Sequence, residues 1–247
     1  MKTKELEWTG DVERGAKGKK ARRVQEWLGL QGVSVAIDED FGGATEIAVR
    51  TFQSRSGLPI TGVVDQATFD RLTAPMRRAL VAMPPNGRRL GELVVAYGQQ
   101  HVAQAPREVG GPNMGPWVRL YNGADGKDQL WCAGFVSTLV RQACESLGID
   151  SPIKLSVGCD ALAANAKAAE RFVAGKDASP TTITPGMIFL LQSKKNAKDW
   201  IHTGIVTHVD VDALGTIEGN TDHDGSSNGY EAATRIRGWV RKDFIQI

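Results

Sequence analysis

The sequence lacks several features that define whole classes of protein. No run approaches the roughly 18 apolar residues of a membrane-spanning helix, so we predict no contact with membrane. The first residues carry lysines without an apolar stretch behind them, which does not fit a secretory signal peptide. Charge is nearly balanced, with 30 basic and 28 acidic residues among 247. Nonspecific binding to nucleic acid needs a basic excess, so we predict no nucleic-acid partner.

Cysteine is also scarce. The three cysteines are Cys132, Cys144 and Cys159, and an odd number cannot complete a disulfide framework. No Cys-x-x-Cys pair and no histidine pair at zinc spacing is present, so we predict no structural metal. The set fits one functional thiol and two spare cysteines, Cys144 and Cys159, in the core.

Residues 1–75 have the pattern of a small helical domain. Lys17–Leu30 carries apolar residues on one helical face. Thr45 is expected to cap a second helix, and a shorter copy of the same pattern, with Thr68, predicts a third helix that reaches Leu72. Proline and glycine in residues 76–89 indicate a linker, part of which (Met76–Ala82) has helical character.

Residues 90–247 place helices first and strands second. This order predicts an α+β domain with an antiparallel sheet. The expected helices are Leu90–Gln104, Cys132–Leu147 and Cys159–Val173. The expected strands are Met187–Leu191, His202–Val209, Leu214–Glu218, Thr234–Trp239 and Phe244–Ile247.

Cys132 stands at the start of an apolar helix. The unpaired N–H groups and the positive dipole end of a helix N-terminus favour the reactive thiolate, although a free cysteine is more often a buried apolar residue. His202 on a strand fits a general base for this thiol. The backbone N–H of Cys132 is the expected donor to an oxyanion.

Two groups on the next strand are candidates to orient His202. Glu218 and Asn220 are two residues apart, so both point to the same face, and either can accept from the far ring nitrogen. His208 shares a strand face with His202, but it lies near the expected hairpin tip. His202 is also followed by Gly204, which leaves space for a substrate backbone. We therefore choose His202 as the base.

The N-terminal motifs resemble a known binding domain. Val24-Gln25-x-x-Leu28, then Asp40-Phe41-Gly42-x-x-Thr45 with Phe52-Gln53, then Gly57-Leu58 through Asp65-x-x-Thr68, are similar to the helical peptidoglycan-binding domain found beside cell-wall hydrolases. This resemblance implies that the domain binds peptidoglycan.

The C-terminal motifs resemble the CHAP family of cysteine- and histidine-dependent amidohydrolases and peptidases. They are Trp131-Cys132-Ala133-x-Phe135-Val136, Thr184-Pro185-Gly186, His202-x-Gly204-Ile205-Val206 and Ile217-Glu218-Gly219-Asn220. The resemblance implies a papain-like fold, with Cys132 as nucleophile, His202 as base, and Glu218 with Asn220 behind it. Gly225–Gly229 and Arg235-Ile236-Arg237 are typical of phage members, which suggests an endolysin.

The remaining candidates concern substrate and calcium. Trp117, Trp131 and Trp200 are candidates to line a substrate groove, and packing is an equal alternative for each. Some family members bind calcium through acidic residues before the nucleophile, and Asn122, Asp125 and Asp128 stand there with irregular spacing. A solvated acidic turn fits them better than a calcium site, so we predict no cofactor.

These observations predict a monomeric hydrolase that cleaves an amide bond of peptidoglycan with a cysteine nucleophile. The bond is either N-acetylmuramoyl–L-alanine or one in the stem or cross-bridge. With no signal peptide, we expect synthesis in a host cytoplasm and delivery to the wall through a pore, by injection or on a virion. The alternatives are a catalytically dead wall-binding protein and a thiol peptidase toxin that acts on proteins.

Overall fold

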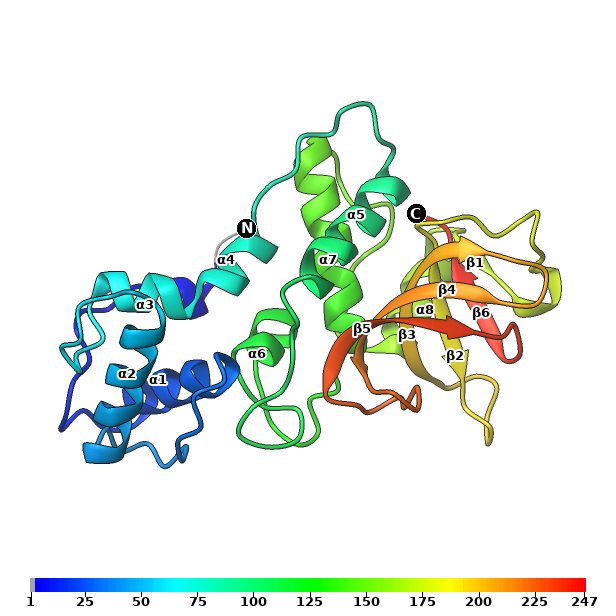
Figure 1. The fold of residues 1–247 in the computed structure, drawn as a ribbon. Helices are drawn as coiled ribbons and strands as arrows, with labels where there is room; N and C mark the ends of the chain where they lie inside the picture. The colour runs from blue at the N-terminus through cyan, green and yellow to red at the C-terminus, as the bar shows by residue number, and fades with distance from the viewer. Residues whose placement is uncertain (1–2) are drawn as a thin grey trace.

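The computed structural model describes residues 3–247. A helical lobe holds the N-terminal part of the chain, and a sheet with flanking helices forms the C-terminal part (Figure 1). The helical lobe contains η1 (Lys4–Leu6), α1 (Lys19–Leu30), α2 (Gly43–Arg55) and α3 (Gln66–Leu72), and α4 (Ala74–Ala79) leads out of it.

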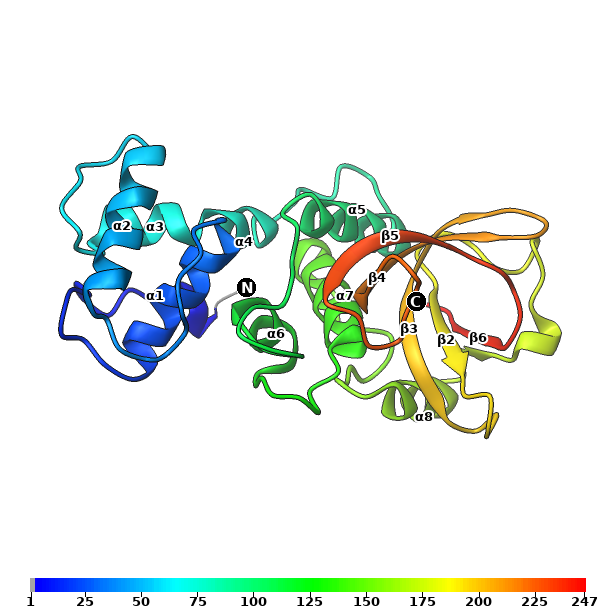
Figure 2. The same cartoon turned by 60° about the horizontal axis from the view of Figure 1, so that its bottom comes forward.

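The C-terminal part has helices followed by strands, so the predicted α+β class with an antiparallel sheet is confirmed. The sheet runs in the order β1-β6-β2-β3-β4-β5, and α7 contacts β3 and β4 (Figure 2). No helix within residues 3–247 is long and apolar enough to cross a membrane. The elements are α5 (Leu90–Val102), α6 (Pro116–Asn122), α7 (Cys132–Leu147), α8 (Cys159–Ala168), β1 (Phe172–Val173), η2 (Gly175–Asp177), β2 (Ile188–Gln192), β3 (Trp200–Val209), β4 (Leu214–Thr221), β5 (Glu231–Arg237) and β6 (Lys242–Ile245).

A repeated glutamine–threonine contact holds the helical lobe together. Gln25 Nε2 donates to Thr45 Oγ1 at 3.1 Å, and Gln53 Nε2 donates to Thr68 Oγ1 at 3.1 Å. Thr45 is therefore not the expected cap, because α2 already begins at Gly43. Asp65 caps α3 by accepting from the Thr68 N–H at 2.8 Å. Both glutamines are buried. Each therefore holds the first turn of the next helix against its own helix through a buried hydrogen bond.

Two other helix predictions needed correction. The helix expected to reach Val173 ends at Ala168, because Glu170 has a positive φ of 55° and Phe172–Val173 pairs with β6 instead. The sequence patterns also did not indicate α6. Within the predicted linker, the Met83 N–H donates to Tyr97 Oη at 2.7 Å, which ties this segment to α5.

An ion cluster joins the two lobes where α1 and α6 meet. Arg119 of α6 donates to Glu5 at 2.7 Å and to Glu26 of α1 at 2.6 Å. Asp125 accepts from Arg119 at 2.7 Å and from Arg22 of α1 at 2.9 Å. The Glu26 side chain is 1% exposed and is paired with Arg22 at 2.7 Å as well as with Arg119.

Candidate functional site

Cys132 is the first residue of α7 and is 2% exposed. The preceding Trp131 is held on both sides: its backbone N–H donates to Asn220 Oδ1 at 3.2 Å, and its indole Nε1 donates to Glu108 at 2.9 Å. The first backbone bond of α7 runs from Phe135 N–H to Trp131 C=O at 2.9 Å. The N–H groups before Phe135 therefore have no partner within the helix, as at any helix start.

His202 and Glu218 meet across the β3–β4 hairpin. Ile205 pairs with Ile217 in this hairpin, which brings the start of β3 near the end of β4 as expected. His202 Nε2 lies 2.8 Å from Glu218 Oε2, and both side chains are fully buried. His208 lies by the hairpin tip, pairs with Gly215 across a register shift and is exposed.

Arg237 of β5 is a further member that the sequence reasoning did not assign. Its Nε donates to Glu218 Oε1 at 2.8 Å, and its Nη2 bonds the other carboxylate oxygen. Thr216 Oγ1 also donates to Glu218 Oε1 at 2.6 Å. Glu218 thus lies between an imidazole and a guanidinium. The available signal was only the i, i+2 alternation of Arg235 and Arg237 on one strand.

The charges in this cluster shift each other's protonation. Burial works against charge on Glu218, but the bonds from Arg237 and His202 lower its pKa to about 2. Burial likewise lowers the pKa of His202, but contacts with Cys132 and Glu218 raise that pKa to about 9. The pKa of Cys132 is lowered well below its ordinary value, first by a hydrogen bond with Cys159 and then, against burial, by His202. The cluster therefore favours a thiolate beside an imidazolium.

The second ring nitrogen of His202 is free for a further partner. Nδ1, opposite the nitrogen that contacts Glu218, is buried without a hydrogen-bond partner among the residues that the structure describes. Cys132 is close enough to raise the pKa of this imidazole. Cys159, the first residue of α8, places its Sγ 3.7 Å from Cys132 Sγ. Cys159 is partly buried and packs against the core, and its thiol also contacts Cys132. Its place against the core agrees with the expectation, and the absence of a function for it stays a prediction.

Asn220 lies in a different place from the one predicted. The register of β4 shifts between Glu218 and Thr221, and Asn220 has a positive φ of 55°, which breaks the two-residue alternation. Its amide therefore bonds Trp131, Asn113 and Gly229 rather than His202. Asn220 positions the residue before Cys132, and Glu218 alone of the two contacts the imidazole.

Gly204 makes room for a protein side chain. A Cβ at this position would lie 2.7 Å from Glu218 Cγ and 2.7 Å from Phe189 Cε1. The expectation of open space for a substrate backbone is therefore wrong. Because Gly204 has no side chain, the Glu218 side chain can lie against the backbone of β3, where it contacts His202.

The three candidate groove tryptophans are interior residues. Trp117 and Trp131 are 1% and 0% exposed and pack with Tyr121, whose ring is stacked on both. Trp200 is also buried, and its Nε1 donates to Asp243 at 2.9 Å. The groove prediction is wrong for these side chains, because the aromatic rings fill the core beneath the site.

The turn before Cys132 is engaged in other contacts. Asp125 joins the Arg119 and Arg22 cluster, so it is neither a free calcium ligand nor a solvated turn residue. Asn122 Nδ2 donates to the Gln129 and Leu130 carbonyls. Among residues 3–247, no group of three or more His, Cys, Asp or Glu side chains is placed to hold a metal ion. The absence of a cofactor stays a prediction.

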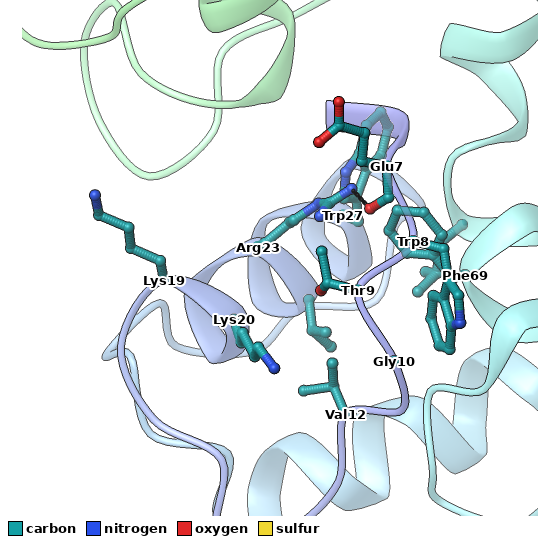
Figure 3. Close-up of a pocket in the computed structure, with 12 residues that line it drawn as sticks. Glu7, Trp8, Thr9, Gly10, Val12, Lys19, Lys20, Arg23, Trp27 and Phe69 are labelled. Carbon is teal, nitrogen blue, oxygen red and sulfur yellow. Dashed lines mark hydrogen bonds between the residues drawn. The ribbon is translucent and has the colours of Figure 1, made fainter. Parts of the chain in front are cut away.

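A separate cavity of about 230 Å³ lies in the helical lobe, between the segment before α1 and the helices α1 and α3 (Figure 3). Trp8 and Phe69 form an aromatic wall, with ring centroids 5.4 Å apart. The Arg23 guanidinium lies 4.5 Å from the Phe69 ring centroid. Lys19, Lys20 and Glu7 are exposed lining residues, so an apolar pocket carries a charged rim in which cations outnumber the single carboxylate.

Comparison with known proteins assigns the helical lobe. Residues 17–72 match the family model of a peptidoglycan binding domain, PG_binding_1. The chain also matches the zinc D-Ala-D-Ala carboxypeptidase of Streptomyces albus G, at 39% identity over 69 residues. That match covers 26% of this chain and 27% of the carboxypeptidase. The predicted domain of the peptidoglycan-binding type is thus confirmed for this lobe.

Two solved structures are similar over a part of the chain. One is a peptidoglycan-binding protein from Clostridioides difficile in complex with glutamine hydroxamate, at 39% identity over 26% of this chain and 40% of that one, with a TM-score of 0.25. The other is a fused Zn-dependent amidase/peptidase/peptidoglycan-binding protein from Clostridium acetobutylicum, at 26% identity over 36% and 42%, with a TM-score of 0.25. The chain thus spans less than half the length of each protein it matches, and the described residues of this chain do not supply a zinc ligand set.

Proposed function

We propose that this protein binds peptidoglycan through its helical lobe and hydrolyses an amide bond of that polymer with Cys132 as nucleophile. One observation carries the proposal. The buried imidazole of His202 contacts the buried Glu218 carboxylate at 2.8 Å, and Cys132 at the start of α7 raises the pKa of the same imidazole. A thiol, an imidazole and a third group that orients the imidazole resemble the sites of CHAP-type and papain-type thiol hydrolases, although the third group in the papain type is an asparagine.

In the proposed reaction, the Cys132 thiolate attacks the amide carbonyl carbon and a tetrahedral oxyanion forms. The backbone N–H of Cys132 donates to that oxygen. The imidazolium of His202 gives its proton to the leaving nitrogen, the C–N bond breaks, and a thioester remains. His202 then takes a proton from water, and the oxygen of that water attacks the thioester. The acid is released, and the Cys132 thiolate is restored beside the His202 imidazolium. Glu218 holds the ring and balances its charge throughout.

Burial sets one requirement on this reaction. Cys132 is 2% exposed and His202 is 0% exposed, so the pair is shielded from bulk water. Shielding strengthens the ion pair, because charges interact more strongly at low dielectric. A substrate carbonyl must displace a covering side chain to come within about 3.5 Å of the sulfur.

The decisive experiment is digestion of purified sacculi by the full chain. Cys132→Ala should abolish release of soluble fragments, whereas Cys144→Ala, the matched thiol control, should retain it. Iodoacetamide should inactivate the wild type and 1,10-phenanthroline should not. Mass spectrometry of the fragments identifies the cleaved bond. Undiminished release by Cys132→Ala, or loss with the chelator alone, would contradict the thiol mechanism and favour a zinc hydrolase like the relatives.

The cavity of Figure 3 is the proposed wall contact. Its apolar wall suits the methyl groups of a stem peptide, and the lysines of its rim suit the peptide's carboxylates. In co-sedimentation with sacculi, using the Cys132→Ala background, Lys20→Glu should weaken binding. The charge-matched control Lys194→Glu, an exposed residue of the other lobe, should not. Free stem peptide should compete, and competition by glycan fragments alone would overturn this assignment.

A further inference from the structure

The two helices α7 and α8 each begin with a cysteine, and these cysteines lie side by side. Their sulfurs are 3.7 Å apart, within hydrogen-bonding distance for a thiol. Cys159 has no part in the reaction proposed above. A second thiol in contact with the nucleophilic sulfur nonetheless changes the environment of the reacting atom.

The two thiols of the pair differ in their surroundings. The groups that face Cys159 are Cys132 from α7, its neighbour Asp160, and Asp199 from the segment before β3. The bond to Cys132, burial, and then the negative charges raise the pKa of Cys159. The pKa of Cys132 is instead lowered, first by the hydrogen bond with Cys159 and then, against burial, by His202. The 3.7 Å contact allows either sulfur to donate, and these opposite shifts favour Cys159 as the donor.

We propose that Cys159 is a positioning residue for the nucleophile, whose S–H donates to the Cys132 thiolate and holds that sulfur toward His202. The inference rests on the proposed function, because it assigns Cys159 a role in the same site. Cys159 S–H and His202 N–H then share the charge of the thiolate. A donor to an ionised acceptor stabilises it more than a donor to a neutral one. A thiol is a weak donor, so its effect is smaller than that of the imidazolium.

The direct test follows alkylation of Cys132 with iodoacetamide against pH in the full chain, by mass spectrometry of the Cys132 peptide. Cys159→Ala removes the donor, and the midpoint of the alkylation curve should rise by up to about one pH unit, a tenfold loss of thiolate below the midpoint. Cys159→Ser keeps an O–H donor and should shift the midpoint less. Cys144→Ala should leave it unchanged.

The reactivity of the wild type gives a second readout that needs no variant. Cys132 should be alkylated at least about tenfold faster than Cys159 at pH 7, because only Cys132 is a thiolate there. Equal rates, or a Cys159→Ala midpoint identical to the wild type, would overturn the inference. Sacculus digestion by the same proteins keeps the two hypotheses apart. If the midpoint rises in Cys159→Ala as expected but the wild type releases no fragments, only the proposed function is contradicted.

Discussion

Arg237 Nε of β5 donates to Glu218 Oε1 of the neighbouring strand β4 at 2.8 Å, although the strand register pairs Arg237 with Leu214. The same carboxylate contacts His202, so the guanidinium controls the imidazole through it. Arg237 is therefore a positioning residue in the proposed site. It acts on His202 through Glu218 and not on the thiol directly.

Replacing Arg237 should weaken the whole chain of contacts. In Arg237→Met, the pKa of Glu218 should rise from about 2, because the buried carboxylate loses its largest stabilising partner. The pKa of His202 should then fall below about 9 as its counter-charge weakens. We expect at least about a tenfold loss of kcat/KM, since a charge-assisted bond contributes about 1.5–3 kcal/mol. Arg235→Met is the control, because Arg235 bonds Glu231 instead.

Activity should fall on the alkaline side as His202 loses its proton. The ion pair exists above the lowered pKa of Cys132 and below the pKa of about 9 of His202. The folded pKa of His202 is above the unfolded value of about 6.5, so its contribution to stability is complete below pH about 6.5 and is lost through pH about 9. Sacculus digestion and thermal unfolding between pH 5 and 10 measure both effects. If the loss of activity at alkaline pH has the same midpoint in Arg237→Met as in the wild type, deprotonation of His202 is not its cause.

Removing Arg119 should uncouple the two lobes. Arg119→Met removes the 2.6 Å partner of Glu26, which is 1% exposed, and leaves Arg22 at 2.7 Å as its remaining partner. The cost should therefore be below the about 3–5 kcal/mol of a fully broken buried pair. Thermal unfolding should show the loss, and adding Glu26→Gln should recover part of it. Arg14→Met is the matched control, because the exposed Arg14–Glu46 pair at 3.8 Å contributes about 0–1 kcal/mol. Equal losses in the two variants would contradict a special role for the interface.

Oxidation should join Cys132 to Cys159. Hydrogen peroxide converts a Cys132 thiolate to the sulfenic acid, and Cys159 then displaces its hydroxyl to form a disulfide and water. The sulfurs need to approach from 3.7 Å to about 2.05 Å. We expect reversible inactivation, with a mass loss of two hydrogens that dithiothreitol restores. Cys159→Ser should instead oxidise irreversibly to the sulfinic acid. An equally reversible loss in Cys159→Ser would exclude this disulfide.

Local patterns in the sequence determined a large part of this protein. The apolar faces and turn residues of residues 1–75 predicted the helical domain that the family model matches over 17–72. The helix from Cys132 to Leu147 has the predicted bounds, because its apolar period and Gly148 are local signals. The short connection between Val209 and Leu214 forced an antiparallel hairpin, so it also predicted the approach of His202 to Glu218.

Only the tertiary structure decided which other groups reach the site. Cys132 and Cys159 are separated by 27 positions and an irregular loop, so no period relates their sulfurs. A register shift in β4 turned Asn220 away from His202, and bulges of this kind break the alternation on which the prediction depended. Trp117 and Trp131 entered the core because the packing of α6 against α7 buries them. Arg237 reached Glu218 because β5 lies beside β4 in the sheet, a neighbour relation that no local pattern of residues contains.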